Sequence, residues 1–236
     1  MSNYIEYLGY QVLNINYTQA RKSFSEGSVL TISPNSYGVA TKNQELNSAL
    51  KRDGLLVLDG VYFGLGYFLK TLKTIEKNQG PDIFYEELAI QNERYGKVFF
   101  LGSTEKTLSL IEARLAEEYP NISYESMSPP YKEKLDDLDN NTVEGAIKEF
   151  APDVVFVGMT CPKQEIWIDE QIHRYPGIIF IAIGGVLDWF AGNYKELHPL
   201  WWKLRLGWLG RAIQRPELLK RNIPNYWIYF KHMLRK

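Results

Sequence analysis

Short apolar runs alternate with longer segments of helical periodicity through most of the chain. Runs of this length that are apolar throughout are typical of strands buried on both faces of a sheet. Strands are expected at residues 10–15, 29–33, 55–58, 97–101, 122–125, 154–157 and 178–183. Because helical segments separate these strands, the pattern predicts an α/β fold with a mainly parallel, doubly wound (Rossmann-like) sheet.

The segments between the strands contain signals for the start of helices. One helix is expected over residues 35–52, capped by Asn35 or Ser36. A second helix begins near Thr104. A third begins at Pro162, because proline suits the first position of a helix. The sequence therefore places helices after strands, as a doubly wound sheet requires.

Length and composition allow one substantial hydrophobic core. With 236 residues, of which 45% are hydrophobic, the chain is expected to form an α/β core, residues 1–194, and an appendage, residues 195–236. Cys161 is the single cysteine, which excludes a disulfide framework and indicates a reducing compartment. Residues 1–10 lack the pattern of a signal peptide, and the apolar stretch at residues 178–187 is shorter than the roughly 20 residues that span a bilayer.

Charge is divided unevenly along the chain. The appendage contains ten basic and two acidic residues, so it carries a net charge of +8, and the preceding 194 residues carry −9. Four of the six tryptophans also lie in the appendage. Such a segment favours an anionic partner, and its aromatic residues together with the acidic body favour a membrane surface over nucleic acid.

The end of the appendage has the spacing of an interfacial helix. The apolar side chains that repeat at helical spacing are Tyr226, Tyr229, Phe230, Met233 and Leu234. Aromatic rings would lie at headgroup level and basic side chains would reach toward water, with Trp227, Phe230 and Leu234 as membrane contacts. In the alternative, these aromatic residues pack on the domain itself or on another subunit of a homo-oligomer.

Candidate site residues follow the predicted strands, because ligands of doubly wound sheets bind beyond the carboxyl ends of the strands. Asp59 comes directly after the apolar run 55–58, and Gly60 would let a substrate approach the backbone closely. The carboxylate of Asp59 could serve as a general base. Alternatively, Asp59 caps the helix that follows it.

The segment 158–165 joins a predicted strand to a helix N-terminus, where free N–H groups and the helix dipole favour a phosphate. The alternative is a plain strand-to-helix turn with Gln164 and Glu165 solvated in the first turn of the helix. Gly184 and Gly185 follow the last predicted strand. No G-x-G-x-x-G fingerprint is present, which disfavours a dinucleotide-dependent dehydrogenase.

The sequence predicts neither a metal site nor a cofactor. Asp137 and Asp139 match the D-x-D pattern of metal-dependent sugar transferases, but they lie in the polar stretch 132–141, within the segment 127–141, rather than at the end of an apolar strand. That segment is expected to be an exposed connection or a short polar helix. The three histidines are scattered, so a zinc site or a histidine-based triad has no support.

Several strings resemble, in the same order, the motifs of the WecG/TagA/CpsF family of bacterial glycosyltransferases. The resemblance covers roughly residues 8–221. Its strings are Ser33-Pro34-Asn35, Leu58-Asp59-Gly60, Gly80-Pro81-Asp82-Ile83-Phe84, Ala151-Pro152-Asp153, Val157-Gly158, Pro162-Lys163-Gln164-Glu165, and Gly184-Gly185 followed by Asp188 and Gly192.

The resemblance implies an inverting, metal-independent transferase with Asp59 as the catalytic base. It further implies that Arg211 and Arg221, in the basic appendage, hold the diphosphate of a lipid-linked acceptor. The residues that it assigns to the donor and nucleotide site are Ser33, Asn35, Gly60, Gly102, Gln164, Glu165, Gly184, Gly185 and Asp188.

The expected reaction moves a hexose or N-acetylhexosamine from a nucleotide donor, UDP being the first choice, to a sugar on a polyprenyl diphosphate. It would serve the synthesis of a cell-surface polysaccharide at the cytoplasmic face of the bacterial membrane. The expected partners are therefore the nucleotide sugar, the lipid-linked acceptor and an anionic membrane surface, without nucleic acid. Two alternatives stay open: a nucleotide-binding oxidoreductase and a noncatalytic peripheral membrane module.

Overall fold

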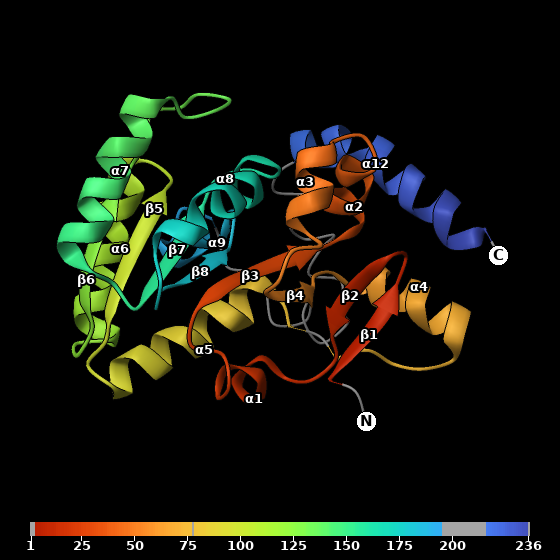
Figure 1. Cartoon of the computed structure of the whole chain (residues 1–236), viewed down its shortest axis with the longest axis horizontal. Helices are drawn as coiled ribbons and strands as arrows, with labels where there is room; N and C mark the ends of the chain where they lie inside the picture. The colour runs from red at the N-terminus through yellow and green to blue at the C-terminus, as the bar shows by residue number, and fades with distance from the viewer. Residues whose placement is uncertain (1–2, 77, 195–215, 236) are drawn as a thin grey trace.

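A six-stranded parallel sheet forms the centre of the molecule. The computed structural model describes residues 3–76, 78–194 and 216–235. The strands lie in the order β4-β3-β8-β7-β5-β6 (Figure 1). Their bounds are β3 (Gly27–Ile32), β4 (Leu55–Leu58), β5 (Lys97–Gly102), β6 (Ser123–Met127), β7 (Val154–Gly158) and β8 (Ile179–Ala182). The predicted α/β, Rossmann-like fold is confirmed, and the six strands match six of the predicted apolar runs to within a few residues.

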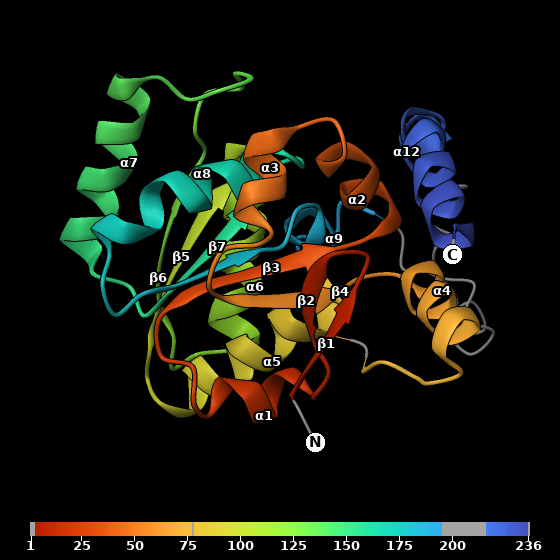
Figure 2. The ribbon, with the colours of Figure 1, turned by 45° about the vertical axis from the view of Figure 1, so that its right-hand side comes forward.

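Helices cover both faces of this sheet (Figure 2). One face carries α2 (Pro34–Ala40), α3 (Gln44–Ala49), α7 (Asp137–Phe150) and α8 (Lys163–Gln171), which a short 3₁₀ turn, η1 (Ile172–Arg174), extends. The other face carries α1 (Tyr17–Arg21), α5 (Gly80–Glu93), α6 (Glu105–Glu118) and α9 (Val186–Phe190). Successive strand residues point to opposite faces, so Leu56 and Leu58 join the first hydrophobic cluster and Leu55 and Val57 join the second.

The segment expected as a first strand, residues 10–15, does not belong to the central sheet. It forms β2 (Tyr10–Leu13), which pairs antiparallel with β1 (Tyr4–Tyr7) in a separate hairpin beside β4. Tyr7 and Tyr10 are buried beneath this hairpin. An apolar run predicts a buried strand, but it does not say which strand it pairs with, because pairing depends on tertiary context.

The single helix expected over residues 35–52 is two helices, α2 and α3. Ser33, rather than Asn35 or Ser36, caps α2: its Oγ accepts from the Ser36 N–H at 3.2 Å, and Ser36 Oγ accepts from the Ser33 N–H at 2.8 Å. Asn43 then starts α3, because its Oδ1 accepts from the Leu46 N–H at 2.8 Å. The capping side chain of Asn43 therefore starts a second helix, so the segment predicted as one helix forms two.

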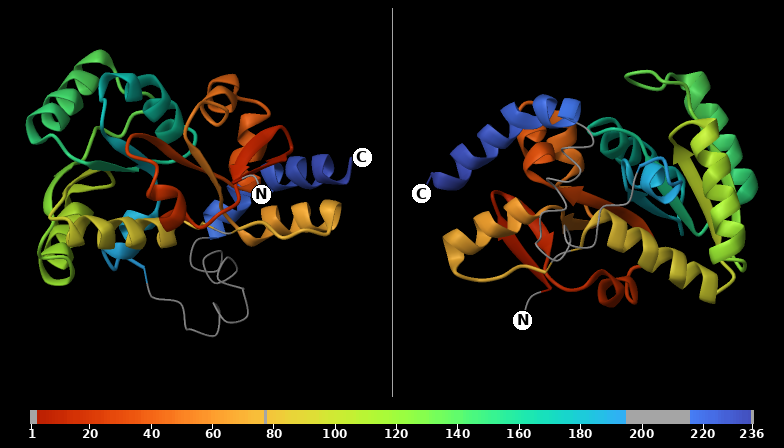
Figure 3. Two further views of the ribbon diagram at one scale, coloured as in Figure 1. Left: turned by 60° about the horizontal axis from the view of Figure 1, so that its bottom comes forward. Right: turned by 180° about the vertical axis from the view of Figure 1, so that it is seen from behind.

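Two helices, α4 (Val61–Thr71) and α12 (Pro216–Leu234), lie side by side beyond the β4 edge and project from the same end of the molecule (Figure 3). Gly66 on α4 makes this contact possible, since a Cβ there would lie 2.2 Å from the Tyr229 hydroxyl. Gly38 on α2 does the same on the other flank of α12, where a Cβ would lie 2.5 Å from Asn225. Gly66 therefore leaves room for side chains of α12, and Gly38 leaves room for its backbone.

Two of the five residues in the predicted apolar stripe of the appendage belong to the hydrophobic core. Tyr229 and Met233 are buried, and Tyr229 stacks on Phe63 with ring centroids 5.2 Å apart. For these two residues of the stripe, the alternative of packing on the domain holds. Trp227 and Leu234 are exposed, and Phe230 is half-buried. Residues 195–215, which include Arg211, lie outside the described residues, and the division at residue 195 stays a prediction.

Candidate functional site

Asp59 and Ser33 lie side by side at the carboxyl edge of the sheet. Ile32 and Leu58 are paired in register, and the Asp59 N–H donates to the Ile32 carbonyl at 2.9 Å, so the next residue of each strand is a neighbour. Gly60 follows with φ of 88° and lies against Pro34. Helix α4 begins at Val61 with Gly60 at the N-cap position, so Asp59 lies one residue before that position.

Ser33 and Asn35, both predicted on the donor side, also hold local structure together. The Ser33 hydroxyl caps α2, and Asn35 Oδ1 accepts from Asn225 Nδ2 of α12 at 2.9 Å. Asn35 therefore ties the N-terminal turn of α2 to α12. Contact of either side chain with a donor sugar stays a prediction.

Gln164 links the end of β7 to the end of β8. Its Oε1 accepts from the Gly184 N–H at 3.0 Å, and its Nε2 donates to Glu165 Oε1 at 2.8 Å. Gln164 and Glu165 are both buried, so the interpretation of these residues as solvated is wrong. The helix begins at Lys163, one residue later than predicted. Gln164 holds two loops of the site together, and contact with the nucleotide stays a prediction.

Glu165 is a buried carboxyl group, and it forms no ion pair within residues 3–76, 78–194 and 216–235. Burial raises its pKa, and hydrogen bonds from Gln164 and from the Cys161 thiol oppose that shift in part. Burial also raises the pKa of Cys161, which therefore fits a small buried residue rather than a nucleophile. The charge of Arg221 acts on the same thiol and lowers its pKa in part. Arg221 itself is exposed on α12.

A second cluster joins β5 to α9. Asp188 Oδ1 accepts from Ser103 Oγ at 3.3 Å, from Thr107 Oγ1 at 3.4 Å and from Asn193 Nδ2 at 3.3 Å. Gly102 has φ of 125°, and a Cβ there would lie 2.5 Å from the Gly158 carbonyl, so only glycine fits this contact. Asp188 thus fixes the turn after β5 against α9. Its predicted role in donor binding is not tested by these contacts.

Helix N-termini surround this edge of the sheet. Side chains cap α2, α6 and α7, whereas α4, α5, α8 and α9 begin without a side-chain cap among the described residues. The N-termini of α5 and α9 are neighbours, since a Cβ on Gly80 would lie 3.6 Å from Val186. N–H groups in the first turn of a helix, together with the helix dipole, favour an anion such as a diphosphate.

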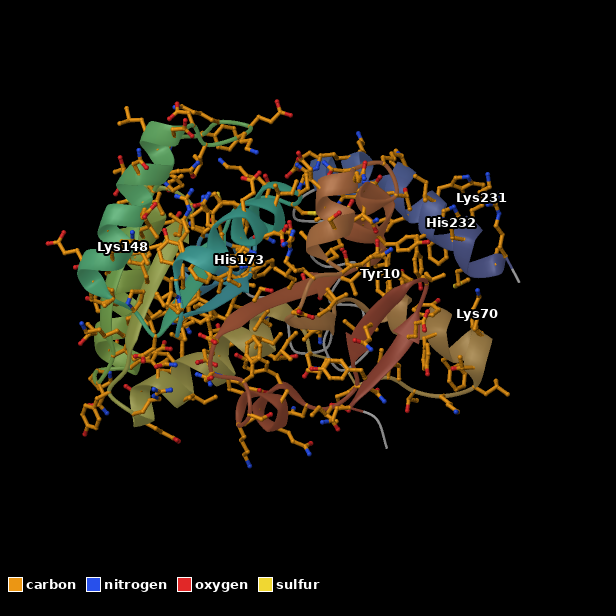
Figure 4. The ribbon with its side chains drawn as sticks, viewed as in Figure 1. Tyr10, Lys70, Lys148, His173, Lys231 and His232 are labelled. Carbon is orange, nitrogen blue, oxygen red and sulfur yellow. The ribbon has the colours of Figure 1, made fainter. Side chains whose placement is uncertain are left out.

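Other features of the sequence lie elsewhere. Asp137 and Asp139 stand in the first turn of α7, where Asp139 completes a capping box with Asp136 and pairs with Lys132. His173 and His232 lie on different parts of the molecule (Figure 4). His232 Nδ1 is hydrogen-bonded to the Tyr37 hydroxyl. His198 lies outside the described residues.

A cavity of about 620 Å³ lies at the opposite edge of the sheet. It is lined by the hairpin and by the residues that precede β4, including Asp53 and Gly54. Ligands of doubly wound sheets bind at the carboxyl ends of the strands, so this cavity is not the candidate site.

Four residues of the candidate site were not predicted as functional: Ser103, Thr107, Asn193 and Asn225. Ser103 follows a predicted strand, and that position is a usable signal. The partners of Thr107, Asn193 and Asn225 lie far away in sequence or across a turn, so no spacing rule indicates them.

Comparisons with known proteins give one consistent result. A family model described as "Glycosyl transferase WecG/TagA/CpsF family" matches residues 5–236. A Staphylococcus aureus (strain NCTC 8325 / PS 47) protein, N-acetylglucosaminyldiphosphoundecaprenol N-acetyl-beta-D-mannosaminyltransferase, is 30% identical over 202 residues, which are 86% of this chain and 78% of the relative. A Bacillus subtilis (strain 168) protein of the same name is 29% identical over 204 residues, covering 85% of this chain and 77% of the relative.

Proposed function

The chain belongs to the WecG/TagA/CpsF family of glycosyltransferases, and from that premise we propose that it transfers an N-acetylhexosamine from a nucleotide donor to a sugar on a polyprenyl diphosphate. Membership in the family excludes the two alternative functions, a nucleotide-binding oxidoreductase and a noncatalytic membrane module. The observation that carries the proposal is the position of Asp59, which lies beside Ser33 at the carboxyl edge of the sheet, next to Gly60.

The relatives suggest the first substrates to test. Their name describes transfer of N-acetyl-β-D-mannosamine to N-acetylglucosaminyl-diphosphoundecaprenol. Helix N-termini without side-chain caps at the site support a nucleoside diphosphate as the leaving group. The first donor to test is therefore UDP-N-acetylmannosamine.

The reaction is a single displacement with inversion at the anomeric carbon. A hydroxyl oxygen of the acceptor sugar attacks that carbon, while Asp59 accepts the hydroxyl proton. The bond to the diphosphate oxygen breaks as the sugar gains oxocarbenium character. Backbone N–H groups at the helix N-termini stabilise the charge that develops on the departing nucleoside diphosphate.

Arg221 is a candidate ligand for the diphosphate of the acceptor. It is exposed on α12, and its positive charge lowers the pKa of Cys161 in part. A guanidinium group can bind phosphate oxygens in a bidentate way. We infer that Arg221 faces the lipid-linked substrate, together with Arg211, which lies outside the described residues.

The protein reaches its lipid-linked acceptor from the membrane surface. In the described part of the chain, no helix combines the length and apolar character needed to cross a bilayer. A basic segment beside an anionic leaflet gains about 1 kcal/mol for each Lys or Arg near the surface. We infer peripheral attachment to the inner face of the cell membrane.

Incubation of the purified protein with UDP-N-acetylmannosamine and N-acetylglucosaminyl-diphosphoundecaprenol should yield a lipid-linked disaccharide and UDP. Mass spectrometry of the lipid fraction checks this result, and a reaction without acceptor reports any hydrolysis of the donor. A panel of UDP-hexoses and UDP-N-acetylhexosamines identifies the donor if another sugar is used. Absence of transfer from every donor in the panel would contradict the proposed reaction.

Chelators should leave the transfer rate unchanged. In residues 3–76, 78–194 and 216–235 no cluster of three His, Cys, Asp or Glu side chains is arranged to hold a metal ion. Helix N-termini and arginine can neutralise the diphosphate in place of a metal ion. The measurement compares rates in EDTA with rates in added Mg²⁺ or Mn²⁺. A rate that falls in EDTA and recovers with either ion would show that transfer depends on a metal.

A further inference from the structure

Helix α4 has an apolar stripe that faces solvent. Leu65, Phe68, Leu69 and Leu72 recur at spacings of three and four residues, so they lie on one face of the helix. Leu69 is 61% exposed, and Leu72, which ends the helix in the left-handed conformation, is 80% exposed. The opposite face of α4 packs in the core through Phe63. This α4 stripe is therefore apolar surface that the described residues leave uncovered.

Helix α12 carries a matching stripe beside it. Ile223, Trp227 and Leu234 are exposed and share one face of the helix, and Trp227 is 72% exposed. Phe230 lies on the same face and meets Tyr62 of α4 edge-on, with ring centroids 6.0 Å apart. The α12 stripe, defined by Ile223, Trp227 and Leu234, thus borders α4 at this ring contact.

The two helices run in the same direction and end together. Phe63 of α4 packs on Tyr229 of α12, and one residue before the end of α4 the Lys70 Nζ donates to the Arg235 carbonyl at 2.9 Å. Figure 4 shows Lys70 and Lys231 at the same end of the molecule. Both stripes therefore reach the same end of the molecule, the tip formed by the C-terminal ends of α4 and α12.

The charge around the stripes is positive. Lys70, Lys73, Lys231 and Arg235 are all exposed near the tip. Helix α4 contains no acidic residue, and the acidic residue of α12, Glu217, lies at the far end of that helix. Exposed apolar side chains flanked by Lys and Arg fit an anionic lipid surface in both composition and charge.

We propose that the α4 stripe and the α12 stripe together dock on an anionic bilayer, so that α4 is a second membrane contact beside the C-terminal helix. The proposal extends the proposed function, which supplies a lipid-linked substrate. Asp59 stands two residues before α4, and a helix of 11 residues is about 16 Å long. Docking of α4 therefore keeps the proposed base within about one helix length of the bilayer surface.

Sedimentation with vesicles tests this surface. The full chain is mixed with vesicles of equal parts phosphatidylglycerol and phosphatidylcholine, and with vesicles of phosphatidylcholine alone. Leu65→Gln, Leu69→Gln and Leu72→Gln are combined in one variant. The matched control combines Leu110→Gln on α6 with Leu138→Gln on α7, two exposed leucines distant from α12.

The α4 variant should bind anionic vesicles about tenfold more weakly than the wild type, because apolar burial and charge attraction act together at such an interface. The control variant should stay within about twofold. Weaker binding by the wild type to phosphatidylcholine vesicles would support the role of charge. If the wild type binds anionic vesicles but transfers no sugar, the proposed function fails and the docking surface stands.

Two results would overturn the proposal. One is an α4 variant that binds anionic vesicles as tightly as the wild type, with the C-terminal helix sufficient by itself. The other is a wild-type dimer that this variant converts to monomers without a change in vesicle binding, which would assign the surface to a second copy of the chain. Thermal unfolding within a few degrees of the wild type establishes that the variant is folded.

Discussion

Replacing Asp59 by asparagine should lower the rate of sugar transfer by about 10²–10⁴-fold, which is the usual contribution of a general base. Asparagine keeps the size of the side chain but cannot accept the hydroxyl proton at neutral pH. The backbone bond from Asp59 to Ile32 does not involve the side chain, so the strand end should keep its position. Nucleotide affinity should therefore stay within a few-fold of the wild type.

Steady-state rates and calorimetric titration with UDP measure these two quantities separately. Asp53→Asn is the matched control, because Asp53 precedes the same strand, β4, at the opposite edge of the sheet. That variant should retain the wild-type rate. An Asp59→Asn enzyme with a rate within about tenfold of the wild type would rule out Asp59 as the base.

Replacing Tyr229 by alanine should lower the free energy of unfolding by about 3–5 kcal/mol, as expected for removal of a large buried aromatic side chain. Tyr229 has no exposed surface, and its ring lies 5.2 Å from Phe63 and 5.8 Å from Tyr37. Its hydroxyl donates to the Tyr62 carbonyl at 3.0 Å. The change would leave a cavity where α12, α2 and α4 meet.

Urea denaturation of three variants separates the contribution of the buried Tyr229 ring from that of its hydroxyl group. Tyr229→Phe keeps the ring and should lower the free energy of unfolding by about 1 kcal/mol, through loss of the hydroxyl bond. Trp227→Ala removes an exposed ring two residues away and should change it by less than about 0.5 kcal/mol. If Tyr229→Ala were no more destabilising than Trp227→Ala, α12 would not be part of the hydrophobic core.

The sheet could be predicted because each of its strands is buried on both faces. A strand such as β7, with Val154, Val155, Phe156 and Val157 all buried, stands out in the sequence as a continuous apolar run. The position of Asp59 follows from the same rule, because a polar residue that ends such a run must lie at the carboxyl edge. These inferences need only local sequence.

The burial of residues on α12 and the hydrogen bonds of the candidate site depend on contacts that sequence spacing does not encode. Helix α12 is apolar on two faces, and periodicity alone could not tell that Tyr229 is buried while Trp227 is exposed. Gln164 looked like a solvated first-turn residue because the Gly184 N–H that it binds is 20 residues away. The hydrogen bond from Ser103 to Asp188 joins residues separated by 85 positions.

The cluster around Tyr229 joins both ends of the described chain, since its hydroxyl lies 3.4 Å from that of Tyr7, a separation of 222 residues. At the usual speeds of translation, a ribosome needs roughly 10–45 seconds to make that length of chain. Throughout this time Tyr7, Tyr37 and Phe63 lack the ring that covers them. A nascent or prematurely terminated chain therefore presents an aromatic surface to chaperones and proteases, and only a chain synthesised past Tyr229 can hide it.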